Sequence, residues 1–414
     1  MLTMSRNILY SACLIFVFVG CGDDQINRSG ITSSHLDQFT VTSIQPGVAD
    51  QIACVGLIRG TNQTVVHLYN RDLSWNKSFD LSKYSEFRGN LKLTCLKEDG
   101  WLISSFKEGS PPSLTIYKTN TNFDISHRYD FGPNLDSNYK ATVRELRQLK
   151  NGDYIVAIDT VVQGPTRTEF GGVRIMRFSN QLSLKYSLSD FGAYRVGHYA
   201  PRILELNDES LFYALGTTIA YLNGIRSDAT VGRIDKDGNI LSTSLLNPAI
   251  TRRFVEPLGL VIKGNAVVLH SRLNFETQSF TQMNASTGKF INEVTLKNSE
   301  INHSQTYGCY ENYYPFTVEL FKSAESNTVS TNGMTDGNLL FSNSAKQLYF
   351  LEMSADLSLR RKFDMVLPEF NQIYSYRQLI TSDNGIIVGA SYEYKDESIF
   401  TLQEYSSDGI VVSR

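Results

Sequence analysis

The stretches Val143–Ile158, VRELRQLKNGDYIVAI, and Val173–Tyr186, VRIMRFSNQLSLKY, decide the fold. Each holds two runs rich in β-branched and apolar residues on either side of a polar turn. The turns contain Asn, Gly or Ser, which supply positive φ angles and local side-chain hydrogen bonds, so each stretch is predicted to be a β-hairpin. Two hairpins in succession predict a four-stranded antiparallel unit of about 50 residues.

The second of these hairpins recurs along the chain. Its seven copies are Val65–Phe79, Leu114–Tyr129, Val173–Tyr186, Thr230–Ser242, Ser279–Val294, Leu348–Phe363 and Ile399–Val412. The residues predicted to enter the turns are Tyr69, Tyr117, Phe178, Ile234, Met283, Met353 and Tyr405. Intervals of about 50 to 70 residues between copies indicate a repeat architecture.

The first hairpin also recurs, ahead of most copies of the second. Its copies are Leu91–Phe106, Val143–Ile158, Ile203–Leu215, Leu258–His270 and Tyr376–Ala390, with turns anchored at Gly100, Gly152, Glu209-Ser210, Gly264 and Gly385. Gln51–Gly56 is expected to fill the first unit, and Asn338–Ser342 after Gly337 fits the sixth less cleanly.

Seven double hairpins predict an all-β fold, a seven-bladed β-propeller of four-stranded antiparallel blades over residues 36–414. The units resemble the repeats of bacterial propeller families, in which a Gly turn precedes an apolar strand and an Asp-x-Asp-Gly turn follows, as at Asp235–Gly238. That resemblance implies a fold and no activity. A pair of β-sandwiches or a β-helix is the alternative, and the four-strand period argues against both.

Length and charge agree with such an architecture. A chain of 414 residues exceeds the ~250–300 residues of a single core, whereas radial sheets bury both faces against their neighbours. The 22 Tyr, 23 Phe and 29 Gly favour strands with tight turns. A net charge of −3 predicts no nucleic-acid partner.

The N-terminus reads as a targeting segment. Arg6 precedes an apolar run from Ile8 to Val19 that is too short to span a membrane, which favours a secretory signal over residues 1–20. The junction Phe18-Val19-Gly20-Cys21 resembles the lipobox of bacterial prolipoproteins, although Phe18 stands where Leu is usual. That resemblance implies cleavage before Cys21, lipidation of its thiol and a membrane anchor. Residues 21–35 would form the tether, and Gly22 in place of Asp favours the outer membrane of the cell envelope. An ordinary cleaved signal is the alternative.

Three further cysteines, Cys54, Cys95 and Cys309, belong to the exported part. Export permits a Cys54–Cys95 disulfide, and three buried free thiols are the alternative. Tyrosines cluster in the long sixth interval, within about 297–336. They form either an aromatic loop that stacks on a ligand or, at Tyr313–Leu320, the inner strand of the sixth unit.

Motifs for catalysis, metals and cofactors are missing from the sequence. It contains no H-E-x-x-H, G-x-S-x-G, P-loop or G-x-G-x-x-G pattern, so neither a metal nor a cofactor is predicted. The turn Asp235–Asn239 lacks the Glu that would close an EF-type calcium loop, because Leu246 occupies that position.

Basic residues recur at fixed distances before the turn anchors. Twelve positions before stand Arg88, Lys140, His198 and Arg252, and eight positions before stand Lys92, Arg144, Arg202 and Arg377. Glu256 and Ile373 interrupt the two series. Residues four apart on a regular strand share a face, so we expect a ring of cations around one mouth of a central channel.

Such a ring predicts a binding site for an anionic ligand, such as an acidic glycan, because arginine forks suit carboxylate and sulfate. Solvated rim charges are the alternative. The sequence therefore favours a binding or scaffold module for an acidic glycan or a partner protein. A lyase or hydrolase acting on an acidic polysaccharide would use His198 and Tyr199, with Tyr194 and Arg202 close by, for acid–base chemistry. A subunit of an outer-membrane assembly complex is the third hypothesis.

Overall fold

The computed structural model describes most of the chain from Phe39 to Ser406. The described ranges are 39–47, 51–61, 63–87, 90–98, 100–107, 113–131, 139–163, 168–191, 197–221, 224–246, 255–263, 265–273, 277–297, 306–309, 317–323, 345–353, 359–365, 372–380, 386–394 and 397–406. Within them the chain is all-β, and its one helical element is a 3-10 turn, Leu81–Lys83, capped by the Asp80 carboxylate. The expected signal and tether, with Cys21, lie outside the described residues.

The first five sheets along the described chain each have four antiparallel strands. The first sheet consists of β1 (Phe39–Pro46), β2 (Ile52–Ile58), β3 (Thr64–Tyr69) and β4 (Trp75–Asp80). The second consists of β5 (Asn90–Leu96), β6 (Gly100–Lys107), β7 (Ser113–Thr119) and β8 (Ile125–Phe131). The third consists of β9 (Tyr139–Gln148), β10 (Tyr154–Gln163), β11 (Thr168–Phe178) and β12 (Leu184–Leu188). They continue with β13 (His198–Glu205), β14 (Leu211–Tyr221), β15 (Gly224–Ile234) and β16 (Ile240–Leu245), then β17 (Val255–Lys263), β18 (Ala266–Leu273), β19 (Thr277–Asn284) and β20 (Phe290–Lys297).

Two further sheets complete the order of described strands. One consists of β21 (Thr306–Cys309), β22 (Thr317–Ser323), β23 (Ala345–Met353) and β24 (Leu359–Met365), and the other of β25 (Gln372–Ile380), β26 (Ile386–Tyr394) and β27 (Glu397–Tyr405). In every sheet each strand pairs with its neighbour in sequence, so the double hairpin is the repeated unit, as predicted.

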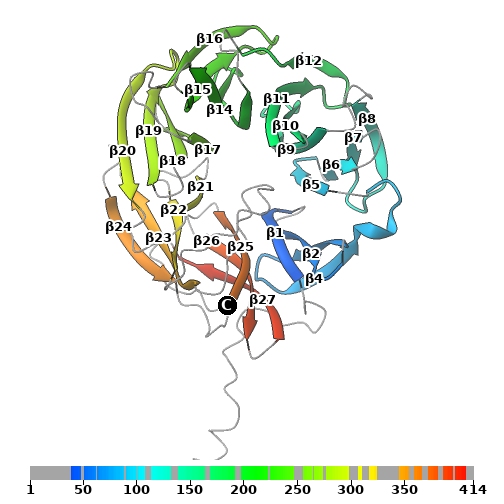
Figure 1. The fold of residues 1–414 in the computed structure, drawn as a ribbon. Coiled ribbons are helices and arrows are strands. Elements are labelled where there is room, and N and C mark those ends of the chain that lie inside the picture. The colour runs from blue at the N-terminus through cyan, green and yellow to red at the C-terminus, as the bar shows by residue number, and fades with distance from the viewer. Residues whose placement is uncertain are drawn as a thin grey trace, which may run out of the picture.

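The sheets stand side by side around a common centre, with their first strands innermost (Figure 1). Apolar clusters fill the spaces between consecutive sheets: Val66 and Trp101 join the first pair, Leu114 and Val156 the next, and Phe212 and Leu269 a later pair. Each sheet is thus buried on both faces, and a long chain forms a series of small cores between neighbouring sheets. The fold is therefore propeller-like.

The first and last described sheets meet and close the ring. Phe39 packs edge-on against Phe400, with ring centroids 5.0 Å apart. The Val41 backbone N–H donates to Ser391 Oγ at 3.1 Å, and Arg71 pairs with Glu404 at 3.3 Å. Residues more than 300 positions apart are thus neighbours, as a radial arrangement requires and a linear stack does not allow.

The outer hairpins share one kind of turn. Asn120 Oδ1 accepts from the N–H groups of Asn122 and Asp124, and Asp235 Oδ1 does the same for Asp237 and Asn239. A residue with positive φ follows three positions after the first turn residue at Leu73, Phe123, Leu182 and Gly238, and four positions after it at Gly288. Gly238 needs its missing side chain as well as its φ of 94°, because an added Cβ would lie 2.7 Å from the Tyr186 ring.

Two sequence predictions need correction here. The residue that enters the second turn is Thr119, which directly precedes Asn120, and not Tyr117, which is buried within β7. In the sixth unit the first strand is β21, Thr306–Cys309, so Tyr313–Leu320 does not supply the inner strand. Its last four residues belong instead to β22, while Tyr313, Tyr314 and Asn338–Ser342 lie outside the described residues. The long sixth interval has little alternation of apolar and polar residues, so the sequence could not show where the β21–β22 hairpin begins.

The innermost strands carry a recurring β-bulge. It occurs at Arg144 in β9, at Ala200-Pro201 in β13 and at Leu258 in β17, and β1, β21 and β25 show register shifts at comparable places. Strand β5 pairs with β6 without such a shift. A bulge places two residues opposite one and re-aims their side chains, so the bulges govern which groups face the centre.

Candidate functional site

The eight predicted cationic positions fall into two groups. Arg88 and Arg252 lie outside the described residues, and for Lys140 and Arg377 only the backbone, in β9 and β25, is described. The remaining four are Lys92 on β5, Arg144 on β9 and His198 and Arg202 on β13. All four belong to innermost strands, as the repeat predicted.

The three Lys and Arg residues of this set each fasten one innermost strand to the bulge of the next. Lys92 Nζ donates to the Arg144 carbonyl at 2.6 Å, and Arg202 Nε donates to the Leu258 carbonyl at 2.8 Å. Arg144 acts through Asp159, whose Oδ2 accepts from Arg144 Nε at 2.8 Å and from the Ala200 N–H at 3.2 Å. Ala200 has a φ of 45°, so this acceptor also supports a strained bulge.

Arg144 differs from the other two because its ion pair is closed. Arg144 and Asp159 are both buried, and the pair joins neighbouring strands β9 and β10. Removing either partner would leave a buried charge without its counterion, which is costly. Arg144 therefore has a structural role within a buried ion pair. Lys92 and Arg202 differ from it because they are only partly buried.

Around Glu145 the structure brings together charged side chains of three innermost strands. Arg147 Nη2 lies 3.0 Å from Glu145 Oε2, and Arg202 Nη1 lies 3.9 Å from Oε1. The side chains of Arg147, Arg202 and Glu145 are 24%, 13% and 15% exposed. Lys92, held at the adjacent Arg144 carbonyl, completes what we call the Glu145 cluster: Lys92, Glu145, Arg147 and Arg202. Three innermost strands, β5, β9 and β13, contribute to it.

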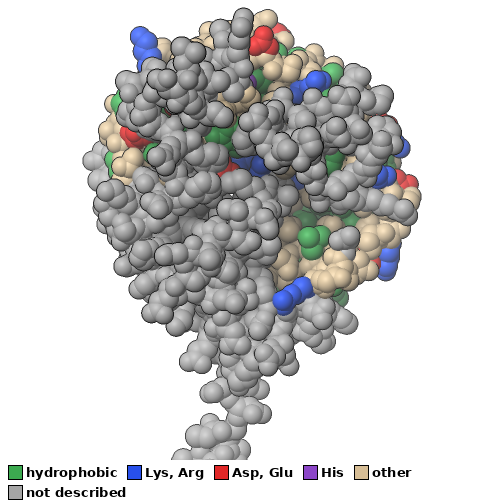
Figure 2. All heavy atoms as spheres, viewed as in Figure 1, with side chains coloured by type: hydrophobic (Ala, Val, Ile, Leu, Met, Phe, Trp, Pro, Cys, Tyr) green, Lys and Arg blue, Asp and Glu red, His purple; other side chains and the backbone are tan. Residues whose placement is uncertain are grey.

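The cluster is electrostatically unbalanced, with three cations and one carboxylate. Burial alone would raise the pKa of Glu145, but Arg147, Arg202 and Lys92 outweigh it and hold that pKa below its usual range. Glu145 is thus ionised at neutral pH. Basic and acidic side chains are visible near the middle of the ring in the space-filling view (Figure 2).

Sequence reasoning missed Glu145 and Arg147, because it counted only basic residues at two fixed distances from the turns. A usable signal was present: Arg144, Glu145 and Arg147 crowd three charges into four positions of a strand predicted to line the centre. The bulge at Arg144 also breaks the regular alternation on which the expected common face of Lys140 and Arg144 depended.

His198 and Tyr199 point into different environments. His198 Nδ1 is 3.0 Å from Thr217 Oγ1, and its ring meets Phe191 edge-on at 6.0 Å. Burial lowers the pKa of His198, against a smaller opposing effect of Asp190. Tyr199 donates its hydroxyl proton to the Val255 carbonyl of the next sheet at 2.6 Å. The two side chains therefore do not converge on one point, and Tyr194 lies outside the described residues.

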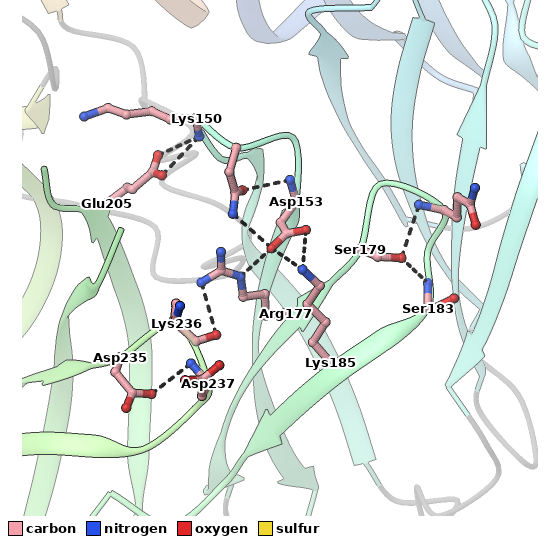
Figure 3. Close-up of polar contacts among 12 residues, drawn as sticks. Lys150, Asp153, Arg177, Ser179, Ser183, Lys185, Glu205, Asp235, Lys236 and Asp237 are labelled. Carbon is pink, nitrogen blue, oxygen red and sulfur yellow. Dashed lines mark hydrogen bonds and ion pairs between the residues drawn. The ribbon is translucent and has the colours of Figure 1, made fainter. Parts of the chain in front are cut away.

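A second charged cluster lies at the hairpin turns of the β9–β12 sheet (Figure 3). Asp153 Oδ2 accepts from Arg177 Nε at 2.8 Å and from Lys185 Nζ at 2.8 Å, and we call these three residues the Asp153 cluster. Arg177 also donates to the Lys236 carbonyl, in the outer turn of the next sheet, at 3.4 Å. Arg177 is 2% exposed and Asp153 7%, whereas Lys185 is 46% exposed, so the Arg177–Asp153 pair is the closed link between the sheets.

The described residues contain no metal site, no disulfide and no membrane-spanning helix. Among the described residues no group of three or more His, Cys, Asp or Glu could hold a metal ion. Cys54 and Cys95 are free thiols, and burial raises the pKa of Cys54 far above its usual value, so no disulfide joins them. From Phe39 to Ser406, within the described ranges, no helix has the length and apolar character needed to cross a bilayer.

Comparisons with known proteins identify a fold and no family. No family model matches the chain, and no curated protein matches it in sequence. The chain is similar in structure to the polysaccharide lyase Uly1, with a TM-score of 0.53, 9% identity and 90% of each chain covered. It also aligns with a protein of unknown function from Dyadobacter fermentans, with a TM-score of 0.47, 10% identity and coverage of 88% of this chain and 96% of that one. A third alignment is with an alpha-L-arabinanase of Penicillium chrysogenum complexed with arabinobiose, with a TM-score of 0.44, 8% identity and coverage of 90% and 94%. The similarity to Uly1 is one of fold.

Proposed function

We propose that this protein binds an acidic glycan at the centre of the ring, through the Glu145 cluster. The observation that carries the proposal is the convergence of cations there: Lys92, Arg147 and Arg202 surround Glu145 and come from three consecutive innermost strands. Arg147 and Arg202 are partly exposed to solvent. Several cations held together at a partly exposed place attract an anionic group.

The chemistry of the cluster fits a saccharide acid. Guanidinium groups bind carboxylate and sulfate through two parallel N–H donors, and Arg147 and Arg202 present such forks from adjacent sheets. The rigid inner strands hold the forks in place, so little conformational entropy is lost on binding. Uly1, to which the fold is similar, is described as a polysaccharide lyase, which agrees with a glycan ligand for a ring of this kind.

The test compares one cation of the cluster with one outside it. Arg147→Gln should weaken binding of an oligogalacturonate about tenfold, because one charge-assisted contact is lost, as measured by titration calorimetry. Arg128→Gln is the matched control: Arg128 also pairs with a carboxylate, Asp130, but lies on the outermost strand β8 and is 55% exposed. Equal affinities for the wild type and both variants across carboxylated and sulfated oligosaccharides would end the proposal.

The proposal includes the cellular setting and the blade count. We place the protein on the outer membrane of the cell envelope, anchored by lipid on Cys21, with a seven-bladed propeller whose last strand follows Tyr405. The lipobox-like Phe18–Cys21 and the seven double hairpins support this. Cys21→Ser should move the protein from the membrane fraction to the soluble periplasmic or extracellular fraction and abolish palmitate labelling. Unchanged membrane fractionation would contradict the anchor.

A further inference from the structure

We propose that Glu145 is an internal competitor for the ligand, occupying the position that a uronate carboxylate takes when an acidic glycan binds. This inference rests on the proposed function and adds the identity of the anionic group. Its basis is the placement of one carboxylate between two guanidinium groups that belong to different sheets.

The two oxygens of Glu145 face two different arginines. Oε2 lies 3.0 Å from Arg147 Nη2, on the same strand, and Oε1 lies 3.9 Å from Arg202 Nη1, on β13. A planar group with two oxygens therefore bridges the two arginines, and a ligand carboxylate has the same shape. The longer distance to Arg202 leaves that fork incompletely used by Glu145.

Other anchors keep the cations in position without Glu145. Arg202 Nε donates to the Leu258 carbonyl at 2.8 Å, and Lys92 Nζ donates to the Arg144 carbonyl at 2.6 Å. Their positions are thus set by backbone carbonyls of the neighbouring sheets. A ligand carboxylate that displaces the Glu145 side chain would find Arg202 and Lys92 already oriented.

The Glu145 side chain can also move away from the two arginines toward solvent. Its side chain is 15% exposed, and its strand is bulged directly before it, at Arg144. Glutamate has three rotatable bonds, so its carboxylate can leave the two arginines while the strand stays in register. Asp159 has no comparable freedom, because it is buried and bonded to both Arg144 and Ala200.

The test removes the competing charge without changing the shape of the side chain. Glu145→Gln should bind an oligogalacturonate about tenfold more tightly than the wild type, because the ligand no longer displaces a carboxylate. The affinity for the carboxyl-reduced oligosaccharide should not change. Asp130→Asn is the matched control, since Asp130 also pairs with an arginine but lies on outer strand β8 and is 54% exposed.

The outcomes separate this inference from the proposed function. If the wild type binds oligogalacturonate and Glu145→Gln binds it equally or more weakly, Glu145 is no competitor, although the site stands. If neither protein binds, both the site and the competitor are wrong. Tighter binding of a dextran sulfate oligosaccharide, which carries sulfate and no carboxylate, than of oligogalacturonate by Glu145→Gln would contradict the preference for a carboxylate. Should Glu145→Gln fail to fold, Glu145→Asp, which withdraws the carboxylate from both arginines, is judged by the same criterion.

Discussion

The Glu145 cluster and the Asp153 cluster are built from the same kinds of residue, and both link the β9–β12 sheet to its neighbour. In each, one carboxylate faces more than one cation. At Asp153, Arg177 and Lys185 both lie at 2.8 Å; Arg177 is 2% exposed and Lys185 46%. At Glu145, the distances to Arg147 and Arg202 are 3.0 and 3.9 Å, and the side chains are 13–24% exposed.

The contacts made by the carboxylate, and not the composition, separate the two clusters. Asp153 Oδ2 accepts from both cations at short distance, and Arg177 gives a further N–H to the Lys236 carbonyl. Glu145 has a short contact with Arg147 only, whereas Arg202 Nη1 stays 3.9 Å from its carboxylate and donates to the Pro201 carbonyl at 3.5 Å. A closed cluster stabilises the fold, whereas an open one can exchange its internal carboxylate for a ligand.

The largest expected effect comes from breaking the closed cluster. Asp153→Asn leaves the buried Arg177 without its counterion and should lower the free energy of unfolding by about 3–5 kcal/mol. Asp130→Asn, which breaks an ion pair with both side chains more than half exposed, should cost less than about 1 kcal/mol. Urea unfolding of both variants measures the difference, and similar losses would erase the distinction between closed and open pairs.

Acid should remove the same stabilisation from the wild type. Burial would raise the pKa of Asp153, but Lys185 and Arg177 outweigh it and lower that pKa below its usual value. A lowered folded-state pKa means that the stabilisation is complete above the unfolded-state pKa, near 4, and is lost as pH falls through the folded value. The stability gap between wild type and Asp153→Asn should therefore be largest at pH 7 and narrow below about pH 4. A gap that is constant from pH 7 to pH 3 would show that the charge of Asp153 contributes nothing.

The sequence predicted the repeated element better than the site. Strand alternation and polar turns such as Asp235–Asn239 are local properties, so the double hairpins and their order could be predicted. The Thr119 turn was misplaced at Tyr117 because both residues precede a polar segment, and only the side-chain hydrogen bonds of Asn120 identify the turn.

The site could be predicted only in part, for a physical reason. The repeat placed Lys92, Arg144 and Arg202 on innermost strands, which the structure has. Their different roles depend on bulges and on contacts between sheets, such as that of Lys92 with the Arg144 carbonyl. The spacing of residues within one strand reveals neither bulges nor contacts between sheets. Arg144, with its buried ion pair, and Arg202, which is partly exposed, therefore had the same spacing pattern in the sequence.

The most direct test of the open cluster is a crystal structure of the protein with an oligogalacturonate. The account predicts a ligand carboxylate within hydrogen-bonding distance of both Arg147 and Arg202, with the Glu145 side chain rotated out of that position and the Asp153 cluster unchanged. A ligand bound elsewhere, with Glu145 still between the two arginines, would contradict it.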